Sequence, residues 1–258
     1  MSDWLHEHHV IWLALVVFGA VFLLAFAIYL TVTRLATGER GKAFARISPG
    51  MLPPLGIIFG LLVGFLAVQV WNDADRARLA VDEEASALRS AVLVSARFPG
   101  QSEERIRELV RGHVERAATE EWPAMADQHA TLTAVAPELA AALETALELE
   151  PRDEGQRVAQ RELVTSLEAA LDARRQRIIV SESSVNWVKW GGVLFLAVLT
   201  LIAIAFVHSE NRLATALAMA IFASAVAVSI TIIAAQERPF SGQFGVDPDA
   251  LLQVEPRP

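Results

Sequence analysis

The chain has 258 residues, of which 53% are hydrophobic and 20% charged, and its formal net charge is −8. It has no cysteine, which excludes disulfides, thiolate metal sites and cysteine nucleophiles. The acidic balance argues against a nucleic-acid partner, for which basic stripes are expected. The central residues 72–186 hold 14 Lys and Arg against 22 Asp and Glu, so they carry the whole negative balance. This central region is therefore expected to face water.

Two pairs of apolar stretches flank the central region. They cover residues 10–32, 51–71, 188–208 and 213–235. Each is long enough to cross a hydrocarbon core of about 30 Å as a helix. The sequence therefore predicts a multi-pass protein of a cell membrane, which we expect to be a bacterial inner membrane, with the lipid bilayer as its first partner.

The pattern predicts an all-α protein with four transmembrane helices (2+2) and an antiparallel four-helix soluble bundle inserted between spans two and three. The expected divisions are a first transmembrane hairpin over 1–71, the bundle over 72–187, a second hairpin over 188–235 and a C-terminal tail over 236–258. No proline stands between Pro54 and Pro99, so span two is expected to continue into the bundle as one helix. A break is expected at Glu121-Trp122-Pro123, and the last bundle helix is expected to run on into span three.

Loop charges predict the orientation of the chain. The connection 33–50 holds Arg34, Arg40, Lys42 and Arg46 against a single Glu39, whereas the nine N-terminal residues hold no Lys or Arg. The positive-inside rule then places 33–50 in the cytoplasm, and the bundle and the tail are predicted to be extracytoplasmic. Four basic residues near span three would favour the opposite orientation if they were counted. Long domains, however, translocate largely regardless of their charge.

Two charged residues lie on the apolar seam of the bundle helices. Glu84 is 12 residues beyond Asn72, and Arg174 is 13 residues before Trp187. In antiparallel neighbours this spacing brings the two side chains to nearly the same height. We expect a partly buried structural ion pair between Glu84 and Arg174; two separately solvated side chains are the alternative.

Span two carries a repeated small-residue motif, Gly56, Gly60 and Gly64, which lets another helix approach closely. One interpretation is tight helix packing within a single subunit. The other is a helix that rings a symmetric pore or forms the seam of an oligomer.

Basic residues gather on either side of the start of span three. They are Arg174, Arg175, Arg177 and Lys189, a predicted membrane-proximal collar. Such a collar is expected either to concentrate anions at a pore mouth or to anchor the protein by snorkelling side chains.

The tail carries Pro239, Phe240 and Gly242 just after span four. Phe240 is expected to pack against helix ends and cover the membrane entrance; a disordered tail is the alternative.

The sequence offers no sign of catalysis. It lacks a glycine-rich phosphate loop and a Gly-x-Ser-x-Gly elbow, and the N-terminal His6, His8 and His9 do not have the His-Glu-x-x-His spacing. We therefore predict no catalytic residue, no metal site and no cofactor.

Several short motifs, in order along residues 51–245, resemble the bestrophin-like family of multi-pass membrane proteins. They are Pro54-Leu55-Gly56, Trp71-Asn72-Asp73, Glu83-Glu84-Ala85-Ser86-Ala87-Leu88-Arg89, Glu120-Glu121-Trp122-Pro123, Arg174-Arg175-Gln176-Arg177 and Pro239-Phe240-Ser241-Gly242. The resemblance implies a distant similarity to bestrophins, which are pentameric anion channels with four membrane helices per subunit. It therefore implies a homo-oligomer with inorganic anions as partners.

Two functions remain as hypotheses. The first is an oligomeric ion channel or permeation protein, selective for anions. The second is a membrane sensor or scaffold whose extracytoplasmic bundle binds a ligand or a partner. The lack of charged residues at the centre of the spans weighs against a proton-coupled transporter. An enzyme of lipid or cell-wall metabolism is a weaker third hypothesis, because no polar cluster at the interface supports it.

The predicted orientation is tested by an epitope tag near residue 130. An antibody is expected to reach the tag when the outer layers of the cell have been made permeable and the inner membrane is still intact, because the bundle is predicted outside the inner membrane. The same tag within 33–50 is the matched control and should become reachable only after lysis. A tag at 130 that needs lysis would reverse the orientation.

Overall fold

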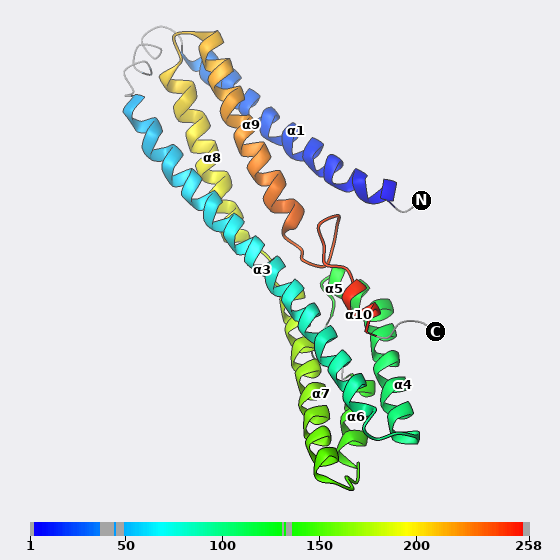
Figure 1. Ribbon diagram of the computed structural model, residues 1–258. Coiled ribbons are helices and arrows are strands. Elements are labelled where there is room, and N and C mark those ends of the chain that lie inside the picture. The colour runs from blue at the N-terminus through cyan, green and yellow to red at the C-terminus, as the bar shows by residue number, and fades with distance from the viewer. Residues whose placement is uncertain (1–2, 37–43, 45–48, 131, 133–135, 255–258) are drawn as a thin grey trace. The chain divides into compact units, whose positions relative to one another are not determined.

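The computed structural model describes residues 3–36, 44, 49–130, 132 and 136–254. All regular elements in this part of the chain are helical, which confirms the predicted all-α class (Figure 1). The chain divides into two compact units. The first, here called the membrane unit, is Met1–Trp71 with Ser184–Glu237. The second, here called the bundle, is Asn72–Ser183 with Arg238–Pro258, so the C-terminal tail belongs to the bundle.

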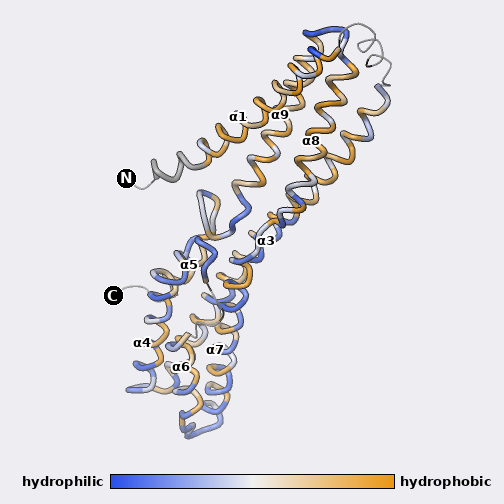
Figure 2. The backbone as a smooth tube through the Cα atoms, turned by 180° about the vertical axis from the view of Figure 1, so that it is seen from behind, coloured by the Kyte–Doolittle hydropathy of each residue, from blue (hydrophilic) through white to orange (hydrophobic). Residues whose placement is uncertain are grey.

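The four predicted spans are confirmed as helices long and apolar enough to cross a membrane. They lie in α1 (Asp3–Leu35), α3 (Leu52–Ser95), α8 (Trp187–Val207) and α9 (Arg212–Gln236). A 3-10 turn, η1 (Pro49–Met51), precedes α3. Figure 2 shows the long hydrophobic stretches of these helices. Arg40, Lys42 and Arg46, on which the predicted orientation depends, lie outside the described residues.

Small residues bring the membrane helices together. Helix α9 packs against α1 and α8, with Ala223 and Ala227 fully buried. Short side chains of this kind let helix backbones approach closely in lipid, where no hydrophobic effect drives association. Phe59 of α3 packs on Phe222 of α9 with ring centroids 5.4 Å apart. The hydroxyl of Thr200 donates to a carbonyl four residues earlier in its own helix and so needs no other acceptor.

Helix α8 begins at its own cap, so it is not a continuation of the preceding bundle helix. The Asn186 side chain accepts the N–H of Val188, which is a typical N-cap bond. Glu237, just after α9, accepts hydrogen bonds from the Val185 N–H and from the Trp190 indole, each at 3.2 Å. The bundle helix α7 (Glu154–Ser181) has already ended at Ser181. The prediction that the last bundle helix runs on into span three is therefore wrong.

Helix α3 is continuous over 44 residues, as the absence of internal proline predicted. Pro53 and Pro54 lie in its first turn, where helices tolerate proline. It is followed by a turn at Gly100, whose φ of 104° favours glycine, and by α4 (Gln101–Arg116).

The prediction of a helix break at Glu121-Trp122-Pro123 is wrong. Helix α4 passes directly into a single π-helical turn, η2 (Ala117–Glu121), and then into α5 (Trp122–Ala126). Pro123 occupies the start of α5, where its missing N–H is not needed. A π turn inside a helix changes the direction of the side chains that follow it, and such turns are frequent at functional sites.

The remaining bundle helices are α6 (Pro137–Leu147), α7 and the short α10 (Asp249–Leu252). Helices α4, α6 and α7 pack against one another in that order, and α10 contacts α4. Apolar side chains from α3, α4, α6, α7 and α10 share one core. Its fully buried members include Leu88, Ile106, Leu139, Leu163, Leu167 and Leu251. Burial of this apolar surface is the main stabilising contribution to the bundle.

Candidate functional site

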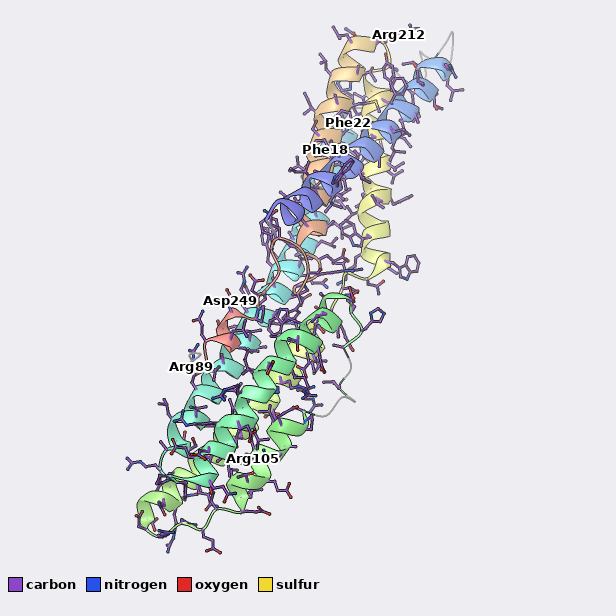
Figure 3. All side chains as sticks on the ribbon, turned by 90° about the vertical axis from the view of Figure 1, so that its right-hand side faces the viewer. Phe18, Phe22, Arg89, Arg105, Arg212 and Asp249 are labelled. Carbon is purple, nitrogen blue, oxygen red and sulfur yellow. The ribbon has the colours of Figure 1, made fainter. Side chains whose placement is uncertain are left out.

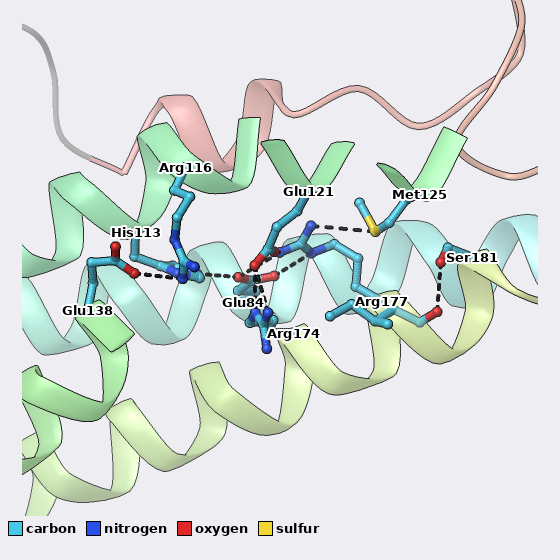
Figure 4. A network of polar contacts seen from close by, with 10 residues as sticks. Glu84, His113, Arg116, Glu121, Met125, Glu138, Arg174, Arg177 and Ser181 are labelled. Atoms are coloured by element: carbon cyan, nitrogen blue, oxygen red, sulfur yellow. Dashed lines mark hydrogen bonds and ion pairs between the residues drawn. The ribbon is translucent and has the colours of Figure 1, made fainter. Parts of the chain in front are cut away.

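Five charged or titratable side chains meet inside the bundle and form the candidate site, here called the buried charge cluster (Figure 4). They come from four elements. Glu84 is on α3, His113 on α4, Glu121 on η2, and Arg174 and Arg177 on α7. Glu84, His113 and Arg177 are each 0% exposed. Charged groups are rarely buried to this extent unless they are paired.

Arg177 joins the two carboxylates of the cluster. Its Nε donates to Glu84 Oε2 at 2.7 Å, and its Nη2 donates to Glu84 Oε1 at 3.2 Å. The same Nη2 donates to Glu121 Oε2 at 2.8 Å, and Nη1 lies 3.6 Å from the sulfur of Met125. Arginine is suited to this position because its planar fork of donors matches carboxylate geometry.

Arg174 holds the second oxygen of Glu121. Its Nε and Nη2 donate to Oε1 at 2.9 and 2.7 Å. Arg174 and Arg177 are three residues apart on α7, so they lie on one face of that helix. Glu121 therefore accepts bonds from two arginines one turn apart, which fixes the π turn against α7.

His113 completes the cluster on the side of α4. Its Nε2 lies 2.7 Å from Glu84 Oε1. An ionised Glu84 only accepts hydrogen bonds, so Nε2 carries the proton of this bond. Nδ1 is buried and has no partner among the described residues. One turn further along α4, Arg116 Nη2 lies 2.6 Å from Glu138 Oε2 of α6.

The surroundings keep both carboxylates ionised. Burial opposes the charge on Glu84, but the Arg177 charge and the His113 hydrogen bond outweigh it and lower the pKa of Glu84. Burial likewise opposes the charge on Glu121, whereas the hydrogen bond from Arg174 and the charge of Arg177 lower its pKa overall. For Arg177, burial favours the neutral form, yet the two carboxylates raise its pKa. The site is therefore a set of mutually dependent buried charges.

The pairing of Glu84 differs from the expected one. We expected Arg174 as its partner, but the guanidinium that binds Glu84 is that of Arg177, and Arg174 binds Glu121. The two arginines lie one turn apart on the same face of α7. Counting residues from the membrane end of each helix therefore does not show which arginine meets Glu84. The alternative of separately solvated side chains is wrong for Glu84, because this residue is fully buried and its Oε2 lies 2.7 Å from Arg177 Nε.

The predicted basic collar is not a set of equivalent side chains. Arg174 and Arg177 are buried and paired with carboxylates, so they do not face solvent. Arg175 is exposed, and Lys189 of the membrane unit is exposed and donates to the Gln69 side chain. Anions in solution can therefore meet only the last two of these residues directly.

Among the described residues of the subunit, nothing packs against the glycine motif of α3. Gly56, Gly60 and Gly64 are all exposed, and a Cβ added at any of them would meet no described atom within 4 Å. The neighbouring Phe59 and Leu66 are the residues of this stretch that are buried against other membrane helices. The glycine face therefore points away from the subunit's own core.

The tail residues Pro239 and Phe240 are ordered on the bundle. Phe240 is buried and meets Trp122 edge-to-face, with ring centroids 5.6 Å apart and planes at 88°. The N–H of Val246 donates to the Pro239 carbonyl at 2.8 Å and closes a loop. Gly242 stands within this loop at φ 78°, a conformation that favours glycine.

Trp122 is a site residue for which sequence reasoning assigned no role. Its indole N–H donates to the Val246 carbonyl at 2.9 Å, and the Arg177 guanidinium carbon lies 4.8 Å from the centre of its ring. Motifs that are far apart in the chain thus meet at one place. The sequence signal available was the unusual composition of these three motifs, which are Glu-Trp-Pro, a pair of arginines and Pro-Phe. Composition alone does not reveal which of them meet in the fold.

No group of three or more potential metal-binding side chains occurs in the described part of the chain. The side chains of His6, His8 and His9 lie outside the described residues.

Comparison with known proteins gives two matches. A family model described as a Bestrophin-like domain matches residues 9–251. A crystal structure of a bacterial bestrophin homologue from Klebsiella pneumoniae, a point mutant of that protein, superposes with a TM-score of 0.69 at 12% sequence identity. The match covers 95% of this chain and 97% of that one, so the two proteins share a fold over nearly their whole length. No curated protein matches the sequence.

The charge cluster predicts a specific acid sensitivity. Both carboxylates have a pKa below the ordinary value of 4.5, so their stabilisation is fully present above about pH 4.5 and is lost as the pH falls through the folded-state values. In urea unfolding at pH 7, Glu84→Gln should lose about 3–5 kcal/mol, because it leaves the Arg177 charge buried without its partner. The variant should also lose less stability than the parent between pH 5 and pH 3.

Glu83→Gln is the matched control, since Glu83 is the exposed neighbour of Glu84 on the same helix. It is expected to change the free energy of unfolding by no more than about 0.5 kcal/mol. Equal losses in the two variants would contradict the role assigned to the cluster.

Proposed function

Because the chain belongs to the bestrophin-like family, we propose that it is an oligomeric channel or permeation protein for inorganic anions. The outward-facing glycine face of α3 carries this proposal. Anion selectivity is inferred from the family resemblance, since bestrophins are anion channels.

A glycine face turned away from its own subunit has little use against lipid. Glycine weakens a helix by about 1 kcal/mol relative to alanine, so three of them at a spacing of four residues need a reason. Close approach of α3 from neighbouring subunits around an axis gives that reason, because Gly56, Gly60 and Gly64 let backbones come together or leave room for an ion. The exposed apolar Ile57, Leu61 and Phe65 on the same helix would then line the seam or a constriction.

The orientation and the exposed basic residues complete the proposal. We retain the extracytoplasmic placement of the bundle, which loop charge supports, and a location in the cell membrane. The part of the collar that attracts anions is reduced to Arg175 and Lys189, because these two side chains are exposed. The sensor hypothesis would gain support if the purified protein bound a ligand and carried no ions.

The proposal is tested by ion flux through purified protein in liposomes, with Gly60→Leu as the informative variant. The parent protein is expected to carry chloride, nitrate or bicarbonate. Gly60→Leu should remove most of this flux or change the subunit count, because a leucine would fill the space between neighbouring copies of α3. Its thermal stability as a single subunit should not fall, since no described atom lies within 4 Å of a Cβ added at Gly60.

Gly19→Leu is the matched control. Gly19 is an exposed membrane glycine on α1 that likewise has no described atom within 4 Å of an added Cβ. It should leave both flux and subunit count unchanged. Absence of flux in every salt would overturn the channel proposal, and equal effects of the two substitutions would remove the role given to α3.

A further inference from the structure

The segment Arg238–Val254, here called the strap, lies on the bundle with little regular structure of its own. Only four of its residues are helical, in α10. It buries Phe240, Leu251 and Val254 in the core and accepts hydrogen bonds from the Trp122 indole at Val246 and from Arg89 Nη2 at Ala250, the latter at 3.3 Å. Figure 3 labels Arg89 near Asp249, at the start of α10. A segment with so little regular structure is expected to open at a lower free energy than the helices beneath it.

Trp122 links the strap to the buried charge cluster. One side of its ring faces the Arg177 guanidinium, its N–H holds the strap backbone, and it packs against Phe240. It also follows Glu121 directly in the chain, at the junction of η2 and α5. The bonds from Glu121 to both arginines therefore fix the backbone position from which the indole reaches the strap.

We propose that the strap is releasable and that its docking is coupled, through Trp122, to the ionised state of the buried charge cluster. The strap begins two residues after α9 ends, so its release would free the chain that directly follows the fourth span. This inference goes beyond the channel proposal and does not depend on it.

The charge balance gives the direction of the coupling. Among the groups that face one another here, the acids are Glu84 of α3, Glu121 of η2 and Glu138 of α6, and the bases are His113 and Arg116 of α4 with Arg174 and Arg177 of α7. Three carboxylates balance three guanidinium groups, so the group is neutral when the histidine is neutral. Protonation of a carboxylate leaves a buried guanidinium without its counter-charge, which is strongly unfavourable. Movement of Arg177 toward water relieves this state, removes its contact with Trp122 and weakens the strap.

The absence of cysteine makes the strap measurable in the full-length protein. Leu251→Cys places one thiol at a fully buried position of the strap, and Leu252→Cys places one at the adjacent position, which is 41% exposed. The ratio of their labelling rates by a thiol reagent, measured in detergent at each pH, reports strap opening with the pH dependence common to both thiols removed. Ala146→Cys, on a fully buried face of α6, reports opening of the bundle itself.

Each reporter is combined with substitutions that test the coupling. Glu121→Gln disturbs the cluster without touching the strap, and Trp122→Phe removes only the indole hydrogen bond and part of the ring. Each is expected to raise Leu251→Cys labelling about five- to tenfold relative to Leu252→Cys, the range expected for one lost hydrogen bond. Acidification of the parent from pH 7 to pH 3 should act in the same direction, because both carboxylates have a pKa below 4.5. Glu120→Gln, at an exposed residue next to Glu121, is the matched control and should have no effect.

The result that supports the inference is faster labelling at Leu251→Cys while Ala146→Cys stays protected. Equal increases at both positions would mean that the bundle opens as a whole, and would overturn the inference of a separate strap. Unchanged labelling at Leu251→Cys in the Glu121→Gln background would overturn the coupling. Labelling of Leu251→Cys as fast as Leu252→Cys in the parent would show that the strap is not docked.

Discussion

The contact between Glu84 and Arg177 is the interaction on which the rest of the bundle depends. Both side chains are fully buried, and transfer of each charge out of water costs several kcal/mol unless the partner is present. The apolar core supplies the driving force for folding, and its apolar contacts are less specific than charged ones against sliding of one helix along another. A buried ion pair does not tolerate such sliding, because a shift of one turn would leave two charges unpaired. The pair therefore sets the register of α7 (Glu154–Ser181) against α3 (Leu52–Ser95).

The other special features of the bundle follow from this pair. Glu121 must reach Arg177 from the end of α4, and the π turn gives its side chain the required direction. Trp122 then lies over the same guanidinium and offers its N–H to the C-terminal segment. A tail of little regular structure is ordered as a consequence. Segments from three distant parts of the sequence thus share one set of charges, and the C-terminal segment packs on Trp122 beside them.

Features that depend on length and composition were predicted well from the sequence. Features that depend on which residues meet in the fold were predicted less well. Span length and missing prolines were enough for the four membrane helices and for the continuity of α3. The choice of Arg177 over Arg174 was not predictable, because helical periodicity places both on one face. The direction of the face with Gly60 was also hidden, since small residues favour close packing without showing whether the neighbour is in the same subunit. The start of α8 at Asn186 depends on a cap, a weaker signal than a proline.

The central claim is that Glu84 and Arg177 form a coupled buried pair, and a double-mutant cycle tests it most directly. Glu84→Gln, Arg177→Gln and the double variant are compared with the parent by urea unfolding at pH 7. Since each single variant leaves a buried charge without its partner, the predicted coupling free energy is about 3 kcal/mol or more. A coupling free energy below about 1 kcal/mol, as for solvent-exposed pairs, would contradict it.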